Sequence, residues 1–231
     1  MKNLLKTMLI RVGLYGLDKR LKKLLRIPKY QMSCPPYDRT TQRRIRASID
    51  VVRYASIALA IHRLRTDGVS GAFAEVGVYQ GELSSFIVSV APETTLHLFD
   101  TFSGFPRQDH ESGEPIEDRF TDTSVGRVRR AIGNCENVVF HEGYFPGTAA
   151  PVLHEMFAFV MLDLDKYKPT LAGLEVFYHR MNRGGYIFVH DYNRLESDYG
   201  VSKAVDDFLR DKAEQLVELP DAGGSVVIRK V

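Results

Sequence analysis

Beyond Gly71 the chain alternates between short apolar runs and longer stretches whose apolar residues recur at helical spacing. The apolar runs predict strands at residues 72–76, 95–100, 138–142, 158–163 and 186–191. The stretches between and after them predict helices near residues 82–90, 124–133, 170–181 and 201–212. Strands that alternate with helices are typical of a doubly wound α/β fold, in which helices cover both faces of a mainly parallel sheet.

Further elements are expected on both sides of this pattern. Residues 215–218 and 225–229 flank a Pro-Asp-Ala-Gly-Gly turn, so we expect a C-terminal hairpin that adds antiparallel strands at the sheet edge. Residues 101–123 are polar and aperiodic, which is typical of a lid or binding loop. Residues 40–65 predict a helical stretch, with inward positions at Ile45, Ile49, Val52, Ile57, Leu59, Ala60 and Leu64.

A basic arm precedes the predicted domain. Residues 1–30 contain nine Lys or Arg residues against one acid, Asp18, and carry a net charge of +8, whereas the whole chain carries +2. The other 201 residues therefore carry −6, which does not favour nucleic acid as a partner. We divide the chain into an arm and linker, residues 1–38, and one α/β domain, residues 39–231. The amphipathic pattern leaves two kinds of partner open for residues 1–28: a protein surface, including a second copy, or an anionic membrane face.

Composition sets the remaining bounds. A length of 231 residues suits one well-buried domain rather than two. The two cysteines, Cys34 and Cys135, lie too far apart in sequence for a metal or redox motif and favour a reduced, cytoplasmic protein. No apolar run approaches the roughly 20 residues that span a bilayer, so membrane contact through the arm would be peripheral, at the inner face.

The first predicted strand leads into a glycine turn that suits a nucleoside-bearing cofactor. Its acid, Glu75, is followed by two glycines four residues apart, Gly77 and Gly81. Glycines permit positive φ and close backbone approach, and an acid after the next strand, Asp100, can bind two ribose hydroxyls. The chain contains neither the dinucleotide fingerprint nor a P-loop lysine. An acid beside a glycine turn without a phosphate cradle favours a cofactor with a cationic amino-acid end, such as S-adenosylmethionine.

Two later strands end in acidic residues. The fourth leads into Asp163 and Asp165, and the fifth leads into His190 and Asp191. Because neighbouring strands lie about 4.8 Å apart, Asp163 and Asp191 can face one point at the carboxyl edge of the sheet. Two carboxylates with open water positions suit Mg²⁺, whereas a histidine ligand at position 190 favours Mn²⁺ or Fe²⁺. Acids at strand ends also cap helices, so a structural role is open as well.

The same edge offers groups for proton transfer. Asp165 or Lys166 can remove the proton of a substrate hydroxyl before its oxygen attacks a methyl group, and Asp165 is the first choice. His190 can serve as a base instead of a metal ligand. Because the acids recur at consecutive strand ends of one sheet, they favour a catalytic cluster over isolated caps.

Five segments make the chain resemble the macrocin-type (TylF-like) O-methyltransferases, which methylate sugar hydroxyls in natural products. The segments are Glu75-Val-Gly-Val-Tyr-Gln-Gly81, Phe99-Asp-Thr-Phe-Ser-Gly-Phe-Pro106, Glu142-Gly-Tyr-Phe-Pro-Gly-Thr148, Asp163-Leu-Asp-Lys-Tyr167 and Gly184-Gly-Tyr-Ile-Phe-Val-His-Asp-Tyr192. The second segment is specific, whereas the glycine motif is shared by many methyltransferases. The resemblance covers about residues 71–209, gives no role to the arm, and implies the Rossmann-like class I methyltransferase fold.

The resemblance also implies roles for particular residues. It implies metal contacts from Asp163 and Asp191, a general base at Asp165, and methyl transfer from S-adenosylmethionine to a sugar hydroxyl. Family members that depend on a metal typically carry two adjacent acids where this chain has His190 and Asp191. Lys166 has the spacing of the basic lysine in catechol-type O-methyltransferases. The implied cofactor site comprises Glu75, Gly77, Tyr79, Gly81, Asp100, Thr101 and Phe102.

Two other functions stay open from the sequence. The Asp163 and Asp191 cluster could serve a metal-dependent hydrolase or another enzyme that uses no methyl donor. The chain could also be a non-catalytic scaffold tethered through its arm, although a scaffold has no use for buried unpaired carboxylates. The acceptor, the methylated position and the oligomeric state have no readable signal in the sequence.

Overall fold

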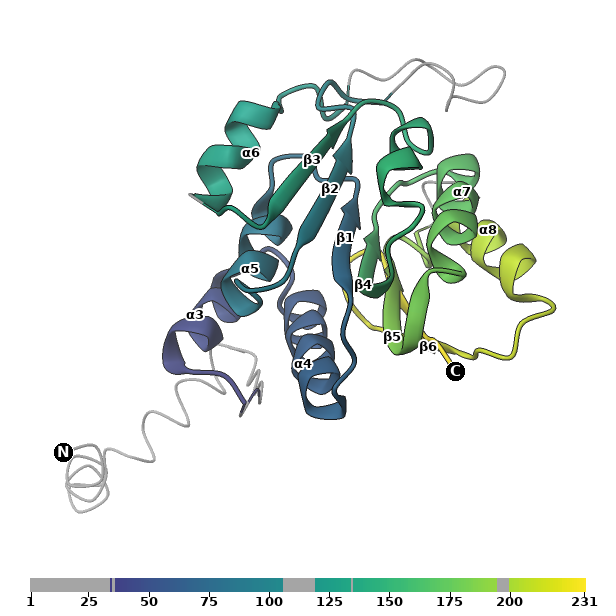
Figure 1. The fold of residues 1–231 in the computed structure, drawn as a ribbon, viewed down its shortest axis with the longest axis horizontal. Helices are drawn as coiled ribbons and strands as arrows, with labels where there is room; N and C mark the ends of the chain where they lie inside the picture. The colour runs from purple at the N-terminus through teal and green to yellow at the C-terminus, as the bar shows by residue number, and fades with distance from the viewer. Residues whose placement is uncertain (1–33, 35, 106–118, 134, 195–199) are drawn as a thin grey trace, which may run out of the picture. The chain divides into compact units, whose positions relative to one another are not determined.

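The computed structural model describes residues 34, 36–105, 119–133, 135–194 and 200–231. These residues form a seven-stranded sheet with the order β3-β2-β1-β4-β5-β7-β6 (Figure 1). Strands β1 to β5 are parallel, and β7 runs antiparallel to both β5 and β6. This confirms the predicted doubly wound sheet with its C-terminal hairpin. The strands are β1 (Ala72–Val76), β2 (Leu96–Asp100), β3 (Val138–Glu142), β4 (Phe157–Leu162), β5 (Met181–Val189), β6 (Leu216–Glu218) and β7 (Val226–Arg229).

Helices cover both faces of this sheet. Figure 1 shows α3 to α6 on one side, and α7 and α8 packed together on the other. The central strand β4 is buried at all six positions because both of its faces are covered. None of the helices within the described residues is long and apolar enough to cross a membrane. The helices are α3 (Arg39–Ala47), α4 (Val51–Asp67), α5 (Glu82–Val90), α6 (Val125–Ile132), the 3₁₀ helix η2 (Gly147–Val152), α7 (Tyr167–Tyr178) and α8 (Gly200–Leu209).

The strand order places a topological switch point at the centre of the sheet. Strands β1, β2 and β3 follow one another toward one edge, and the chain then returns to place β4 on the other side of β1. In open α/β sheets a crevice forms beyond the carboxyl ends of the strands at such a point. The turns after β1, β2, β4 and β5 therefore carry the candidate site.

The prediction of one helical stretch over residues 40–65 is wrong, because the chain breaks between α3 and α4. The Ser48 hydroxyl donates to the carbonyl of Ile45 (2.7 Å) at the end of α3, and Asp50 accepts from the Arg53 amide (3.0 Å) to cap α4. Ile49 lies in the break and is 81% exposed, and Leu59 is 39% exposed, so neither faces inward as predicted. Local capping by Ser48 and Asp50 overrides the helical periodicity.

Other boundaries differ less. Strand β5 begins at Met181, five residues before the predicted start at 186, and α7 ends at Tyr178 instead of 181. The glycine pair in β5 hides the first half of this strand from a search for apolar runs. The 3₁₀ helix η2 was not predicted from the sequence.

Only the end of the predicted arm and linker belongs to the described residues. Cys34 is buried, and the Tyr37 hydroxyl donates to the carbonyl of Ala58 in α4 (2.6 Å), so the end of the linker packs on the domain. Residues from Cys34 onward form one unit. Residues 1–33 lie outside the described residues, and their predicted helices and partners stay predictions.

Candidate active site

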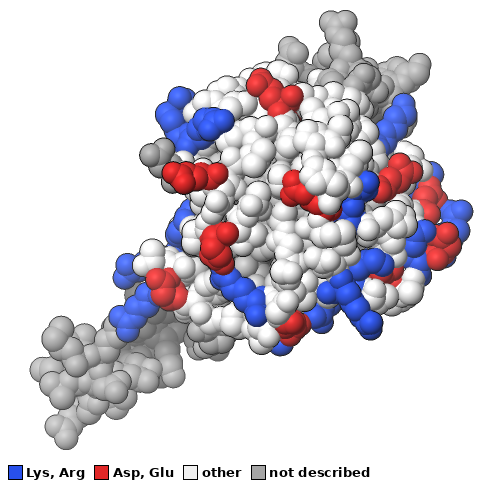
Figure 2. All heavy atoms as spheres, in the orientation of Figure 1, with Lys and Arg blue, Asp and Glu red and all other residues white. Residues whose placement is uncertain are grey.

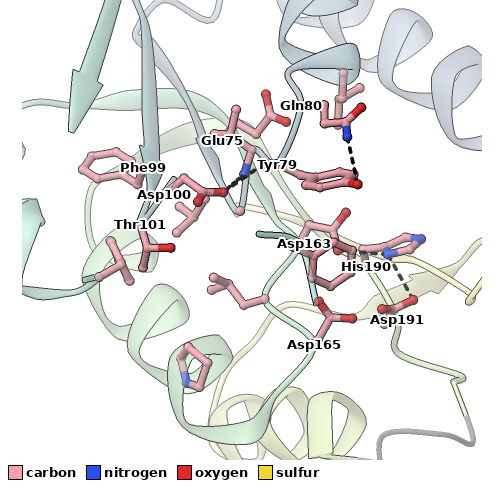
Figure 3. A pocket seen from close by; sticks show the side chains of 18 of the residues that line it. Glu75, Tyr79, Gln80, Phe99, Asp100, Thr101, Asp163, Asp165, His190 and Asp191 are labelled. Carbon is pink, nitrogen blue, oxygen red and sulfur yellow. Dashed lines mark hydrogen bonds and ion pairs between the residues drawn. The ribbon is translucent and has the colours of Figure 1, made fainter. Parts of the chain in front are cut away.

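The carboxyl ends of β1, β2, β4 and β5 surround a cavity of about 590 Å³ (Figure 3). Its wall includes the glycine turn after β1, Asp100 at the end of β2, and the acids that follow β4 and β5. The volume lies within the range of roughly 300–1,000 Å³ that is common for small-molecule sites. Five of the seven predicted cofactor residues thus share one cavity with the predicted acid cluster, whereas Gly81 and Phe102 do not line it.

Asp100 organises two turns at one end of the cavity. Its Oδ2 atom accepts hydrogen bonds from the amides of Val78 (2.7 Å) and Tyr79 (2.9 Å). Its Oδ1 atom accepts from the amide of Phe102 (2.7 Å). Because a carboxylate has about four acceptor positions, Asp100 can still receive a ligand hydroxyl.

The two glycines of the turn are required by the chain's own packing. Gly77 has a φ of +88°, and an added Cβ atom would lie 1.9 Å from the carbonyl oxygen of Asp163. Gly81 is the N-cap of α5 and has a φ of +80°, and an added Cβ atom would lie 2.7 Å from Val128 of α6. The predicted positive φ is confirmed. The close approach at Gly77 is to the end of β4, which joins the glycine turn to the acid cluster.

Glu75 is a buried acid at the end of β1 that lines the cavity. It is 2% exposed, and its Oε2 atom accepts a hydrogen bond from the Ser84 hydroxyl (2.6 Å). Burial raises the pKa of Glu75 to about 8, and the charges of Asp163 and Asp100 add to this rise. A cationic ligand group nearby would favour the ionised form of Glu75.

A polar network ties the glycine turn to the segment before α6. The Tyr79 hydroxyl and the Gln80 side-chain amide donate to the two carboxylate oxygens of Asp122, each at 2.7 Å. Arg127 in turn donates to the amide oxygen of Gln80 (2.7 Å). The Tyr79 ring packs edge-on against Phe120, and both rings line the cavity. This network fixes one wall of the cavity.

The two residues after Asp100 lie in different places. Thr101 lines the cavity, and its hydroxyl donates to the carbonyl of Gly104 (2.7 Å). Phe102 is buried, packs toward Phe140 and does not line the cavity. Of the predicted cofactor residues, Phe102 therefore has the environment of a core residue. Other aromatic side chains supply the apolar lining: Phe99, Phe105, Tyr144 and Phe145.

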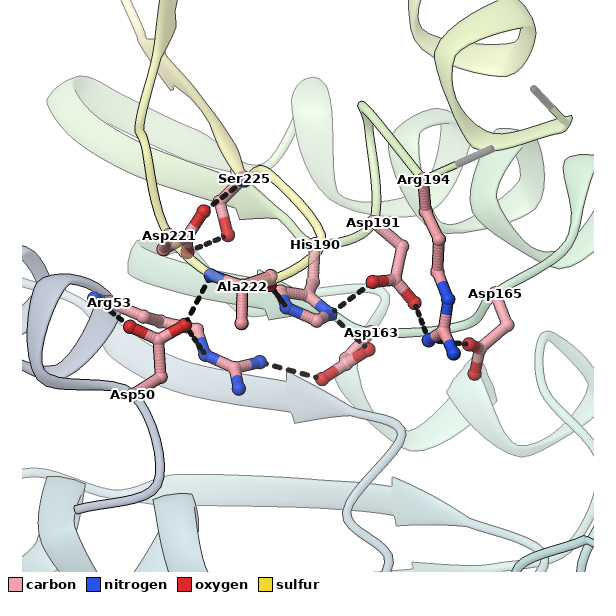
Figure 4. A network of polar contacts seen from close by, with 10 residues as sticks. All are labelled: Asp50, Arg53, Asp163, Asp165, His190, Asp191, Arg194, Asp221, Ala222 and Ser225. Atoms are coloured by element: carbon pink, nitrogen blue, oxygen red, sulfur yellow. Dashed lines mark hydrogen bonds and ion pairs between the residues drawn. The ribbon is translucent and has the colours of Figure 1, made fainter. Parts of the chain in front are cut away.

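The acids after β4 and β5 converge with His190, as the strand geometry predicts (Figure 4). Asp163, His190 and Asp191 each offer a ligand atom within 4.8 Å of the others. His190 Nδ1 lies 3.1 Å from an oxygen of each aspartate, and Nε2 lies 2.7 Å from the carbonyl oxygen of Ala222. Because both ring nitrogens face oxygen atoms, these contacts assign a proton to each nitrogen. Burial opposes this charge, but the two carboxylates outweigh burial and raise the pKa of His190 to about 10.

Asp165 lies beside this cluster and lines the cavity. It is hydrogen-bonded to Asp191, and the Arg194 guanidinium lies 3.7 Å from its Oδ1 atom. Burial raises the pKa of Asp165 well above its ordinary value, and the charge of Asp163 adds to the rise. Burial also acts on Asp191, but its interactions with His190 and Asp165 hold its pKa well below the ordinary value. Below the raised pKa of Asp165 the pair therefore shares one proton, held mainly by Asp165, and above it Asp165 is ionised.

Asp165 and Asp191 both have a positive φ angle. Asp165 has a φ of +58° and Asp191 a φ of +60°, which non-glycine residues adopt at a cost. Such strain clusters at functional sites, where the surrounding fold over-determines the conformation. Lys166, the second candidate base, precedes α7 and does not line the cavity. The geometry thus favours Asp165 over Lys166 for contact with a bound molecule.

Comparison with known proteins assigns this arrangement to a family. The family described as Macrocin-O-methyltransferase (TylF) matches residues 47–220. The chain belongs to this family. The match extends from the end of α3 to the hairpin and leaves out the basic arm.

The individual relatives share only low sequence identity with this member of the family. Mycinamicin III 3''-O-methyltransferase from Micromonospora griseorubida is 25% identical over 165 residues, which are 62% of this chain and 64% of that protein. The O-methyltransferase NovP has a TM-score of 0.65 and 24% identity, over 78% of this chain and 80% of NovP. The calicheamicin methyltransferase CalS11 has a TM-score of 0.60 and 20% identity, over 87% of this chain and 95% of CalS11. The solved structures show that the fold is shared.

Two arginines at the acid cluster were missed by the sequence analysis. Arg53 of α4 lies 3.2 Å from Asp163 Oδ2, and Arg194 lies 3.1 Å from Asp191 Oδ2. Arg194 could have been found, because it follows Asp191 by three residues. Arg53 had no such signal, since 110 residues separate it from Asp163.

The hairpin turn between β6 and β7 is a third missed part of the site. The carbonyl of Ala222 accepts from His190 (2.7 Å), and the Ala222 amide donates to Asp50 Oδ2 (2.8 Å). An added Cβ atom on Gly223 would lie 2.2 Å from Asp191 Oδ1, so the turn closes directly over this carboxylate. The Pro-Asp-Ala-Gly-Gly sequence predicts a turn, but only the sheet order brings it beside β5.

Proposed function

We propose that this protein transfers a methyl group from S-adenosylmethionine to a hydroxyl of a sugar or of a glycosylated small molecule. The observation that carries the proposal is one cavity with two chemical ends. The glycine turn, Glu75 and Asp100 line it at one end, and Asp165 with the acid cluster lines it at the other. Methyl transfer to a hydroxyl needs such a pairing of a donor site with a proton acceptor.

The residues of the glycine turn fit S-adenosylmethionine. Its amino group would offset the cost of burying Glu75, and Asp100 retains acceptor capacity for ribose hydroxyls. The aromatic lining suits the adenine ring. When bound, this cofactor supplies a methyl group that is already activated on a sulfonium.

The chain's own groups orient the acceptor and take one proton. With the cofactor bound, Asp165 would accept the proton of the acceptor hydroxyl, and the methyl group would pass to the oxygen from the sulfonium, which is left as a neutral thioether. The raised pKa of Asp165 makes its carboxylate a stronger base than that of an exposed aspartate. Asp191 and Arg194 hold Asp165 in place, and the aromatic lining keeps water from the reacting atoms.

The acceptor class is suggested by the relatives. The mycinamicin relative is a 3''-O-methyltransferase, and CalS11 is described as a TDP-rhamnose 3'-O-methyltransferase of calicheamicin biosynthesis. We infer a sugar acceptor and a role in natural-product biosynthesis for this chain. On the face shown in Figure 2, acidic and basic side chains of the described residues are interspersed, which does not favour nucleic acid as a partner.

Divalent-metal assistance by Mg²⁺, Mn²⁺ or Fe²⁺ at Asp163, His190 and Asp191 stays a sequence-based prediction. In the structure, the oxygens of these acids already face nitrogens of the imidazole and of two arginines. This donor set does not fit an open cation site.

The basic arm carries a separate proposal. We infer that residues 1–28 contact either the inner membrane face or a second copy of the chain, consistent with a cytoplasmic protein. Deletion of residues 1–28 should lower binding to anionic vesicles in the first case. It should change the oligomer size measured by sedimentation in the second.

Isothermal titration calorimetry with S-adenosylhomocysteine tests the proposed donor site. We expect one site per chain with micromolar affinity, and no heat at high micromolar ligand would refute the proposal.

A turnover assay over nucleotide sugars and glycosylated metabolites then tests the acceptor class. Hydrolytic turnover in cofactor-free protein would favour a metal-dependent hydrolase. Binding of S-adenosylhomocysteine without turnover of any acceptor would favour a scaffold.

A further inference from the structure

The carboxylates that form the predicted metal site are already surrounded by side-chain nitrogens. Asp163 Oδ1 lies 3.1 Å from His190 Nδ1, and Asp163 Oδ2 lies 3.2 Å from the Arg53 guanidinium. Asp191 Oδ1 lies 3.1 Å from the same Nδ1 atom of His190, and Asp191 Oδ2 lies 3.1 Å from the Arg194 guanidinium. All four oxygens therefore face a donor nitrogen of the protein, and two of these donors are guanidinium groups that keep their charge at any working pH (Figure 4).

The side of the cluster away from the cavity is closed. Asp191 is 2% exposed, and its Oδ1 atom is buried without a well-aligned hydrogen bond, although His190 Nδ1 lies 3.1 Å away. Gly223 covers this oxygen so closely that a Cβ atom would lie 2.2 Å from it. Mg²⁺ usually keeps several water ligands, and the hairpin turn takes up the space on this side of Asp191 Oδ1.

The orientation of the imidazole also disfavours a metal ligand. Nε2 faces the carbonyl oxygen of Ala222 at 2.7 Å, so it carries a hydrogen. A metal ligand would then need a free lone pair on Nδ1. Nδ1 lies 3.1 Å from two carboxylate oxygens, and as a hydrogen-bond donor to them it offers no lone pair.

We propose that Arg53, His190 and Arg194 take the place that a divalent cation would hold between Asp163 and Asp191. Together they place a nitrogen within 3.2 Å of each of the four carboxylate oxygens. The acids are thus neutralised and held by the protein itself. The inference deepens the proposed function, and it rests on that function only for its consequence that methyl transfer needs no added metal.

The cluster then acts as a positioning device for Asp165. Arg194 contacts both Asp191 and Asp165, so the same guanidinium that neutralises one acid orients the other. Arg53 ties Asp163 to α4, and its amide is capped by Asp50, which also binds the hairpin turn. Three distant parts of the chain therefore fix the geometry that a metal ion would otherwise set.

Manganese titration of the full chain tests the proposal. The protein is stripped with EDTA, dialysed and titrated with Mn²⁺, and free Mn²⁺ is read from its electron paramagnetic resonance signal. We expect no stoichiometric site in the unmodified protein. A tight site for one Mn²⁺ per chain would overturn the proposal if Asp191→Asn removes it. The titration of the unmodified protein itself requires no variant to fold.

The reciprocal variant is His190→Asp, which restores a second acid next to Asp191. We expect it to bind one Mn²⁺ at least about tenfold more tightly than the unmodified protein, and Asp163→Asn in the same background should abolish the gain. His154→Asp makes the same exchange at an exposed position and should gain no site. A folded His190→Asp protein without added affinity would overturn the assignment to His190, with circular dichroism as the check of folding.

Metal binding and methyl transfer are read separately in these experiments. If the unmodified protein binds no Mn²⁺ yet also fails to bind S-adenosylhomocysteine, the proposed function fails while the inference about the cluster stands. If it binds S-adenosylhomocysteine and loses turnover on EDTA treatment with recovery on added Mn²⁺, the proposed function stands and the inference fails.

Discussion

Gly77 and Asp163 lie in direct backbone contact, since a Cβ atom on Gly77 would come within 1.9 Å of the Asp163 carbonyl oxygen. The Asp163 amide also donates to the carbonyl of Val76 (2.9 Å), so the end of β4 is tied to the end of β1 from both sides. The contact joins the two ends of the cavity. The position of Asp163 therefore depends on the glycine turn as well as on its own strand.

Replacing Gly77 by Ala should destabilise the domain by more than about 3 kcal/mol, because the new side chain meets fixed backbone at positive φ. Urea unfolding measures the loss. Gly68→Ala is the matched control, since Gly68 has a φ of +68° but nothing within 4 Å of an added Cβ, and it should cost only about 1–2 kcal/mol for the left-handed conformation. Equal losses in the two variants would show that the contact with Asp163 has no energetic weight.

Replacing Asp165 by Asn should lower turnover by roughly 10²–10⁴-fold, because the amide cannot accept the proton of the acceptor hydroxyl. The affinity for S-adenosylhomocysteine should persist, since Asp165 lies at the other end of the cavity, and calorimetry checks this. Lys166→Gln discriminates between the two candidate bases. Loss of turnover in Lys166→Gln with full activity in Asp165→Asn would exchange their roles.

The pH dependence of turnover should report the raised pKa of Asp165. The base must be ionised to act, so kcat/KM should fall as the pH drops through a value well above the ordinary pKa of an aspartate. Arg194 lowers the pKa of Asp165, so Arg194→Gln should move this acid limb to higher pH. Arg210→Gln removes an exposed arginine elsewhere and should leave the limb in place. An unchanged limb in Arg194→Gln would contradict the coupling.

Glu75 should make stability fall with rising pH. Its pKa is about 8 in the folded chain and about 4.5 when unfolded, so between these values only the folded state holds the proton. Glu75 contributes on the order of 5 kcal/mol to the free energy of unfolding below a pH of about 4.5, and this contribution is lost as the pH rises to about 8. Urea unfolding between pH 5 and pH 8 measures it. Glu75→Gln should flatten the profile, whereas Glu136→Gln, at an exposed position, should not. Parallel profiles for Glu75→Gln and the unmodified protein would show that Glu75 has an ordinary pKa in the folded state.

Much of the sheet was predictable because each parallel strand is a buried apolar run between polar residues. The predictions for β1 and β3 are confirmed to the residue, β2 begins one residue later than predicted, and β4 is shifted by one residue at both ends. The helical stretch over residues 40–65 was wrong because Ser48 and Asp50 satisfy backbone groups locally, which a periodicity count does not register. Strand β5 was cut short because its glycine pair lacks apolar side chains.

The candidate site was predictable where strand geometry alone determines position. Asp163 and Asp191 follow neighbouring parallel strands, so their convergence follows from the strand pattern. The contacts of Arg53 and Ala222 with the cluster could not be predicted, because they depend on how α4 and the hairpin pack across the sheet. Phe102 was placed with the cofactor on the strength of its motif, but its side chain turns into the core.

By itself, the sequence determined the order of strands and helices, the glycine turn and the presence of acids at the strand ends, because burial and backbone geometry act over short distances. Only the tertiary structure decided which groups neutralise those acids. Coulombic and hydrogen-bond partners are chosen by proximity in space, and the 110 residues between Arg53 and Asp163 leave no local signal of their contact.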